Sequence, residues 1–306
     1  MRLSTSYMYQ RNMDSMSNAN INFNNVYMRL AAGQTLLKPS DDPGGASQAV
    51  IYQNALSDIS QYETARQYAG NSLRDEDNVL NSISSLLTKN LSEKIVQAGN
   101  DTYSDADREA LAIELEGIRD SLLDFGNSKD SNGRYIFGGY KTGSAPFLKD
   151  GTYVGGDSVI TQMVGDSTEM QVGHLGSDIF MSGTDDDLFV ALNNAIDALK
   201  QPIESDEDRQ ALQEVLDKSN RSINKCIDNV GKVQATVGTN LQQLEQLGLS
   251  SDLNRISVET SLEQTVGADG DSRIMLVSQA AMVEFSLQSS MFVFKSMQKL
   301  SIFNMV

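Results

Sequence analysis

The clearest pattern along the chain is a run of apolar positions between residues 212 and 247 that recur at alternating steps of four and three. This spacing keeps one side chain per turn on the same face and is typical of a long, coiled-coil-like helix. The positions are Leu212, Leu216, Ser219, Ile223, Cys226, Val230, Val233, Val237, Asn240, Leu244 and Leu247. Because Cys226 belongs to this seam, we interpret it as a small buried side chain rather than a reactive thiol.

A second long helix is predicted to begin at Pro43. Asp42 precedes this proline, which fits a capping carboxylate followed by the first helical position. Apolar residues then recur with helical spacing as far as Leu87, although Arg66 and Glu76 interrupt the seam.

Two shorter helices are predicted between these long ones. Ser104 and Asp107 have the spacing of a capping box, and apolar periodicity follows as far as Phe125. Another periodic stretch runs from Leu188 to Leu199 and ends before Pro202.

Each end of the chain carries a further heptad pattern with few charges. Residues 1–40 and 270–306 contain five charged side chains each and together hold ten of the 13 Met residues. Isolated helices rich in Asn or Ser are marginal in water, so we expect the two ends to pack together, to fray in the isolated subunit and to order on docking. The predicted assembly interface consists of Met16, Phe23, Val26, Leu30, Val283, Leu287, Phe294 and Met297.

Glycine marks the main change of composition, since 11 of the 23 Gly residues lie between positions 131 and 183. Short Thr-, Val- and Ile-containing runs in this window predict strands joined by tight turns. We therefore expect a mainly α fold with a small β-rich domain: a hairpin of long helices with the β insertion at its tip. The predicted domains are terminal coiled-coil helices (1–42 with 270–306, disordered in the monomer), a helical bundle (43–130 with 185–269) and a β-rich outer domain (131–184).

The composition narrows the range of functions. The 306 residues include 24 Lys and Arg against 41 Asp and Glu, a formal charge of −17, which argues against nucleic acid or an anionic membrane as partner. The apolar C-terminal stretch is broken by polar residues, so we expect no membrane insertion. A single Cys cannot form a disulfide within the chain, and the N-terminus has no continuous apolar stretch of the kind a cleaved secretion signal requires.

Candidate catalytic and metal-binding residues are few, and we expect no enzyme, cofactor or metal. His174 is the only histidine and lies among glycines, which favours a surface or turn position. The run 185–187 of three Asp residues is interpreted as the acidic start of the following helix rather than a cation site. Catalysis would have to depend on a carboxylate pair such as Asp150 and Asp157.

Two motifs resemble a known family. The segment Ser40, Asp41, Asp42 and Pro43, together with the first residues of the chain, resembles the amino-terminal pattern shared by bacterial flagellins and hook-filament junction proteins. The more specific motif resembles the distal hook-associated (FlgL) family rather than filament flagellin. It comprises Gly133, Arg134, Tyr135, Phe137, Gly139 and Tyr140.

The resemblance implies a structural adaptor of the bacterial flagellum, exported through the flagellar secretion channel without cleavage and placed between hook and filament. It implies four kinds of contact: the preceding hook-filament junction protein, flagellin, further copies in a ring or layer, and an export chaperone on the C-terminal segment. A filament-forming flagellin is the alternative within the same class. An enzyme on a flagellin-like scaffold is a less favoured alternative.

Overall fold

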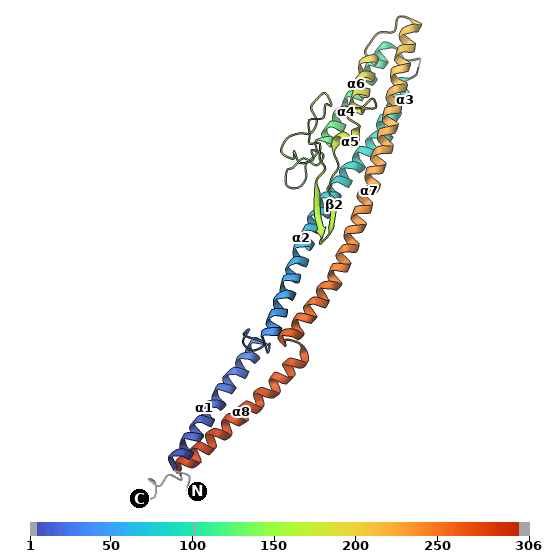
Figure 1. Ribbon diagram of the computed structural model, residues 1–306. Helices are drawn as coiled ribbons and strands as arrows, with labels where there is room; N and C mark the ends of the chain where they lie inside the picture. The colour runs from blue at the N-terminus through green and yellow to red at the C-terminus, as the bar shows by residue number, and fades with distance from the viewer. Residues whose placement is uncertain (1–4, 101, 300–306) are drawn as a thin grey trace. The chain divides into compact units, whose positions relative to one another are not determined.

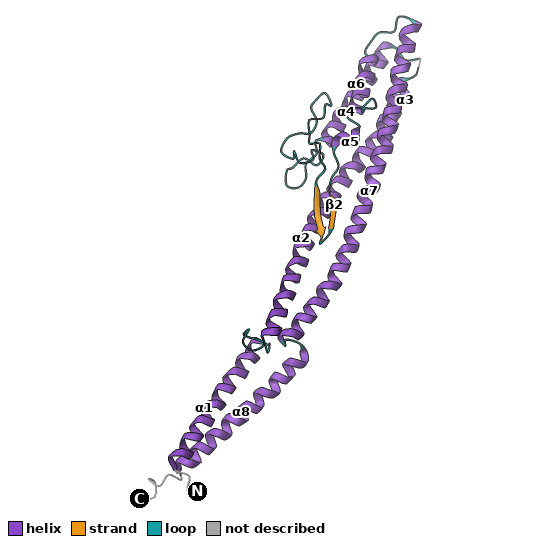
Figure 2. Cartoon of the chain, in the orientation of Figure 1, coloured by secondary structure: helices purple, strands orange, loops and turns teal. Residues whose placement is uncertain are grey.

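The computed structural model of the chain describes residues 5–100 and 102–299 (Figure 1). It divides into two compact units, one formed by residues 61–250 and the other by residues 1–60 with 251–306. The elements are mostly helical, with a single pair of short strands among the described residues (Figure 2). In order they are α1 (Thr5–Ala32), α2 (Pro43–Ser85), the π-helical turn η1 (Leu86–Leu91), α3 (Ser92–Ala98), α4 (Asp105–Gly126), β1 (Thr161–Gly165), β2 (Thr168–Gln171), α5 (Gly176–Phe180), α6 (Leu188–Leu199), α7 (Asp206–Val266) and α8 (Gly270–Lys299).

Three helices, α2, α4 and α6, begin where the sequence predicted. Asp42 Oδ1 accepts a hydrogen bond from Gly44 N–H at 3.0 Å at the start of α2. Ser104 and Asp107 form the complete capping box of α4. Asp187 caps α6, its carboxylate accepting hydrogen bonds from the N–H groups of Phe189 and Val190. These caps satisfy N–H groups that have no partner within a helix.

The 61–250 unit is built around the predicted α7 seam. Nine of its eleven predicted positions are buried, and Asn240 and Leu247 are half-buried. They pack against apolar residues of α2, α4 and α6 in one continuous core. Cys226 is buried, as predicted, and this burial raises the pKa of its thiol to about 12.

The glycine-rich window contains less strand than the sequence predicted. β1 and β2 form one antiparallel pair with Thr161 opposite Gln171. Residues 127–160 are turns and loops with two isolated bridges, and they are anchored by a cluster of four aromatic rings. These rings, from Phe147, Tyr153, Phe180 and Phe189, have neighbouring centroids 5.0 to 5.4 Å apart.

The hairpin lies along the helices of its unit, not at their end, which corrects the predicted tip position (Figure 1). Arg66 Nη1 of α2 donates to Val164 O at 3.0 Å, and Asn240 Nδ2 of α7 donates to Gln171 O at 3.1 Å. The end of the unit is formed instead by two helix-to-helix connections, whose residues Tyr103 and Ile203 line one cavity. The hairpin takes this position because Arg66 of α2 and Asn240 of α7, which hydrogen-bond to its backbone, lie within these helices and not at their ends.

In the other unit, α1 packs against α8. The connection between α1 and α2 lies beside the connection between α7 and α8. α7 ends at Val266 and α8 begins at Gly270. Thr35 N–H and Leu36 N–H both donate to Val266 O at 3.0 Å, and Thr35 Oγ1 donates to the same oxygen at 3.2 Å. Gly267 has a φ of +63°, and a Cβ there would overlap Thr35 Oγ1. We call this contact between residues 35–36 and 266–267 the paired break. The predicted division at residues 42/43 and 269/270 stays a prediction.

Candidate assembly surface

The heptad seams of the two ends face each other within one chain. The Tyr9 and Phe294 rings lie 5.6 Å apart, and Tyr27 Oη donates to Glu284 Oε2 at 3.2 Å. Asn12 Nδ2 also contacts Met297 Sδ. The expectation that the ends meet therefore agrees with the structure, whereas their order in the isolated subunit stays a prediction.

All eight residues predicted for the assembly interface belong to this intramolecular pair, and each is half-buried. The residues concerned are Met16, Phe23, Val26 and Leu30 of α1, and Val283, Leu287, Phe294 and Met297 of α8. Ala19, Leu276 and Ala280 are the buried apolar side chains described along α1 and α8. The eight side chains thus cover each other before any second subunit arrives, and their contact with other subunits stays a proposal.

A second apolar face on α8 is open to solvent, and the sequence reasoning missed it. Phe285 and Phe292 are each 72% exposed. The sequence contains a heptad spacing for this face, because Phe285 and Phe292 are seven residues apart, as are Met275 and Met282. A helix that is apolar on more than one side is typical of a buried environment. The exposed face consists of Ile274, Met275, Val277, Met282, Phe285, Met291, Phe292 and Val293.

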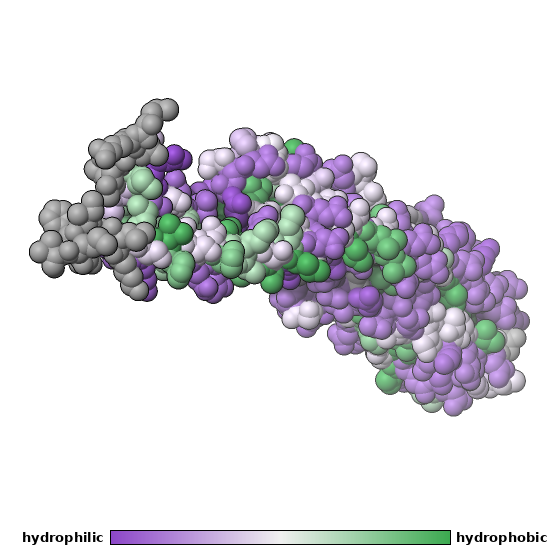
Figure 3. Space-filling model, turned by 90° about the horizontal axis from the view of Figure 1, so that it is seen from below, coloured by the Kyte–Doolittle hydropathy of each residue, from purple (hydrophilic) through white to green (hydrophobic). Residues whose placement is uncertain are grey.

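The outer side of α1 carries polar and apolar residues together. Its exposed residues include Asn18, Asn20, Asn22, Asn24 and Asn25, and also the apolar or aromatic side chains of Tyr7, Met8, Tyr9, Met13, Ile21, Tyr27 and Met28. Figure 3 shows hydrophobic surface, in green, along the helices that adjoin the grey terminal residues. Among the described residues of the terminal unit, the two most exposed aromatic side chains, Phe285 and Phe292, belong to α8.

The first family motif shapes the connection between α1 and α2. Asp41 Oδ2 accepts hydrogen bonds from the N–H groups of Leu37 and Lys38 at 3.3 and 3.2 Å, and it lies 3.6 Å from Arg29 Nη2. Ser40 and Pro43 are exposed. The motif therefore has a local structural role: it closes the turn after α1 and caps α2.

The second family motif builds a tight loop. Arg134 Nη2 lies 2.9 Å from Asp130 Oδ2, and Tyr135 stacks beneath Lys129 Nζ at 4.6 Å from the ring centroid. Phe137 is fully buried. Gly133 and Gly139 have φ values of +78° and +56°, which favour glycine.

The candidate catalytic residues have structural partners. His174 lies in a loop, as predicted, but its side chain is only 11% exposed because it contacts Glu76. Asp150 Oδ1 accepts a hydrogen bond from Thr152 N–H at 2.9 Å, which lowers the pKa of this carboxyl. Asp157 is exposed and accepts from Ser158 Oγ. Within the described ranges, no group of three or more His, Cys, Asp or Glu side chains is placed to hold a metal ion.

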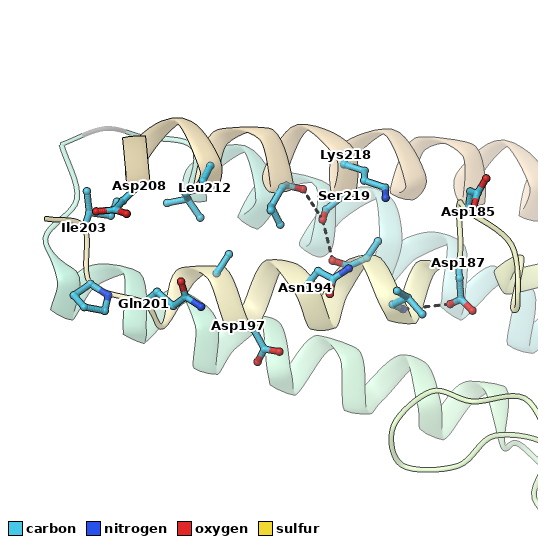
Figure 4. Close-up of a pocket in the computed structure, with 16 residues that line it drawn as sticks. Asp185, Asp187, Asn194, Asp197, Gln201, Ile203, Asp208, Leu212, Lys218 and Ser219 are labelled. Carbon is cyan, nitrogen blue, oxygen red and sulfur yellow. Dashed lines mark hydrogen bonds between the residues drawn. The ribbon is translucent and has the colours of Figure 1, made fainter. Parts of the chain in front are cut away.

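A groove of about 420 Å³ lies between α6 and α7 in the 61–250 unit (Figure 4). Its apolar surface comes from Val190, Ala198, Ile203, Ala211, Leu212 and Val215. Four Asp residues and a single Lys, Lys218, also line it. The Ser219 hydroxyl donates to Ala191 O and Val215 O, each at 2.9 Å.

Comparison with known proteins decides the family. The model of the bacterial flagellin N-terminal helical region matches residues 3–142. Flagellar hook-associated protein 3 of Escherichia coli K12 is 38% identical over 319 residues, covering 100% of this chain and 99% of that protein. The chain belongs to the FlgL family of flagellar hook-associated proteins. A second FlgL relative, from Salmonella typhimurium, is 37% identical over the same length.

Solved structures agree on the fold. A putative flagellar hook-associated protein from Vibrio parahaemolyticus superposes with a TM-score of 0.67 at 22% identity, covering 74% of this chain and all of that one. Hook-associated protein 3 from Legionella pneumophila gives 0.65 at 19% identity, covering 72% and 99%. Filament proteins match less of the chain: the 41 kDa core protein of Borreliella burgdorferi is 30% identical over 33% of it. The FlgL family is therefore favoured over filament flagellin.

Proposed function

We propose that this chain is a structural adaptor that joins hook to filament in the bacterial flagellum through helix packing between subunits. The full-length match to hook-associated protein 3 carries the proposal. The exposed apolar face of α8 supports it, because a face containing Phe285 and Phe292 at 72% exposure needs a partner in the assembled state. No catalytic step belongs to this role.

The partners follow from the position of such an adaptor. One end of the assembly contacts the preceding hook-filament junction protein and the other contacts flagellin, while further copies of this chain form a ring or layer. An export chaperone holds the C-terminal segment before assembly. The chain reaches the outside through the flagellar secretion channel without a cleaved signal. Among the described residues, no helix is both long and apolar enough to cross a bilayer.

The experiment compares two exposed aromatic positions. Phe285→Ser removes an apolar side chain from the α8 face, whereas Tyr68→Ser removes one of similar exposure, 66%, from α2. Each variant is expressed in a strain that lacks this protein, and hooks are examined by electron microscopy while flagellin is measured in the medium. We expect Phe285→Ser, alone or with Phe292→Ser, to leave hooks without filament and to release flagellin, and Tyr68→Ser to restore filaments.

Two results would contradict the adaptor role. One is normal filament growth in the strain that lacks the protein altogether. The other is growth of long filaments composed of this chain alone on hook seeds, which is the behaviour of a filament flagellin. Circular dichroism and urea unfolding of the purified Phe285→Ser and Tyr68→Ser variants serve as controls that the 61–250 unit remains folded in each.

A further inference from the structure

Methionine is concentrated at the two ends of the chain, where residues 1–40 and 270–306 hold ten of the 13. On α8 three of them face solvent: Met275 is 53% exposed, Met282 63% and Met291 44%. The first two are the most exposed methionines among the described residues. Met16 and Met297, by contrast, are half-buried in the pair that α1 forms with α8. A reagent dissolved in water can therefore reach the three exposed side chains while α1 and α8 stay paired.

The exposed methionines lie on the open face of α8 together with its exposed phenylalanines. Met275 and Met282 are seven residues apart, and Met282 precedes Phe285 by three. Side chains at these spacings are neighbours on one face of a helix. Met291 adjoins Phe292, which is 72% exposed. The other apolar residues of this face carry aliphatic or phenyl groups, so the thioether is the one group here that a mild oxidant converts from apolar to polar.

The conversion is a two-electron oxidation. A lone pair on the methionine sulfur attacks one oxygen of hydrogen peroxide, so that an S–O bond forms and the O–O bond breaks. The sulfur loses two electrons and the peroxide is reduced. The departing hydroxide takes up the proton of the transferred oxygen and leaves as water. The product, methionine sulfoxide, is polar and disrupts apolar interfaces, and methionine sulfoxide reductases convert it back to methionine.

We infer that Met275, Met282 and Met291 form an oxidation site for peroxides, and that their sulfoxides prevent the open face of α8 from docking. An apolar face contributes to an interface because its area is removed from water, and a sulfoxide oxygen opposes that removal. The covered seam between α1 and α8 is a different face, so the subunit keeps its fold when the open face is oxidised. The inference rests on the proposed adaptor function, since it names a modification that regulates the same surface.

Peptide mapping of the full-length chain by mass spectrometry tests the site itself. The chain is treated briefly with hydrogen peroxide, catalase removes the peroxide, and the sulfoxide fraction of each methionine is followed with time. We expect Met275 and Met282 to oxidise about tenfold faster than Met170, which is 4% exposed. Cys226 does not compete for the oxidant because it is buried. Equal rates for Met282 and Met170 would overturn the site.

Sedimentation with purified hooks tests the consequence for docking. The hooks come from a strain that lacks this protein, and the oxidant is removed before they are added, so only this chain carries sulfoxides. We expect brief oxidation to reduce hook binding by the wild-type chain about tenfold, and reductase treatment to restore it. Unchanged binding by the oxidised chain would overturn the inference while the adaptor function stands. Failure of the untreated wild-type chain to bind hooks would overturn the adaptor function and, with it, the docking part of the inference.

Substitution by leucine removes the thioether and keeps the face apolar. In the triple variant Met275→Leu, Met282→Leu and Met291→Leu, we expect peroxide to change hook binding by less than about twofold relative to the untreated variant. Met163→Leu is the matched control, because Met163 lies on β1 with the same 44% exposure as Met291. This control should stay as sensitive to peroxide as the wild-type chain. A loss of wild-type size in the triple variant would assign the effect to other methionines and overturn the inference.

Substitution by glutamine imitates the sulfoxide without any oxidant, because its side chain is polar and of similar length. Glutamine at the three α8 positions should reduce hook binding in untreated samples, whereas Met163→Gln should not. Circular dichroism checks that each variant is helical. Full hook binding by the glutamine triple variant would show that the face tolerates polar groups, and it would overturn the inference.

Discussion

Glu76 Oε1 is the common partner of two groups of His174, whose backbone N–H donates to it at 3.0 Å and whose ring Nδ1 lies 2.9 Å away. Glu76 is completely buried on α2, and His174 lies in the loop after β2. The carboxylate therefore fastens the β-rich loop to the helical core. Its second oxygen, Oε2, has no hydrogen-bond partner among the described residues.

Removal of this carboxylate should destabilise the 61–250 unit. Glu76→Ala leaves the His174 N–H without its acceptor and opens a cavity, so we expect a loss of about 2–4 kcal/mol in the free energy of unfolding. Glu76→Gln keeps an acceptor oxygen and should cost less than half as much. Urea unfolding measures both, with the exposed Glu245→Ala as control. Equal midpoints for Glu76→Ala and the control would show that the contact contributes nothing.

This pair also shows where sequence reasoning stops. The helices of this chain were predictable because caps and periodicity are local properties of the sequence. Glu76 and Arg66 registered only as interruptions of the α2 seam, since their partners His174 and Val164 are each 98 residues away. No local signal pairs residues at that separation.

The same limit applies to the assembly surface. The seam containing Val283 and Leu287 was predictable from its heptad spacing, but that seam is already covered by α1. Which face of α8 remains open depends on where α1 packs, and this follows from tertiary structure alone. The exposed residue Phe285 was therefore missed although its spacing from Phe292 repeats the heptad.

Substitutions on the two faces of α8 should have different effects. Leu287→Ser weakens the pairing of α1 with α8 by about 1–3 kcal/mol because it exposes a half-buried contact to water. Phe285→Ser leaves the pairing intact. Amide exchange of α1 in the isolated subunit should accelerate severalfold in the first variant and stay unchanged in the second. Acceleration of equal size in both would assign Phe285 to the intramolecular seam.

The terminal pair should be far less protected than the rest of the chain in dilute solution. Few of its side chains are fully buried, whereas the α7 seam lies in a continuous core. We expect amides of α1 and α8 to exchange at least about a hundredfold faster than those around Val230. Addition of purified hooks should slow their exchange. Equal protection of α1 and the α7 seam in the free subunit would rule out ordering on docking.

Gly267→Ala should disrupt the paired break. The positive φ of +63° is strained for alanine, and the new Cβ overlaps Thr35 Oγ1. We expect faster exchange of the Thr35 and Leu36 amides and a loss of at least about 1 kcal/mol in the terminal unit. Gly248→Ala is the matched control, because that helical glycine has open space around it. Unchanged exchange in Gly267→Ala would mean that the break tolerates a side chain.

The capping boxes of α4 and α7 should respond to acid independently. Hydrogen bonds from Ser104 Oγ and Ser104 N–H hold the pKa of Asp107 below its ordinary value of 3.8, and Ser205 acts in the same way on Asp208. Each carboxylate therefore stabilises its helix above the ordinary pKa, and that contribution is lost as the pH falls through the lowered value. In NMR titrations, Ser104→Ala should raise the pKa of Asp107 alone and Ser205→Ala that of Asp208 alone. A shift of the wrong carboxyl would contradict these assignments.

The paired break has a mechanical consequence. Since Val266 O accepts hydrogen bonds from the N–H groups of Thr35 and Leu36, the α1–α2 and α7–α8 connections are joined to each other. A force applied to the end of α8 is therefore carried by the α7–α8 connection and, through these hydrogen bonds, by the α1–α2 connection.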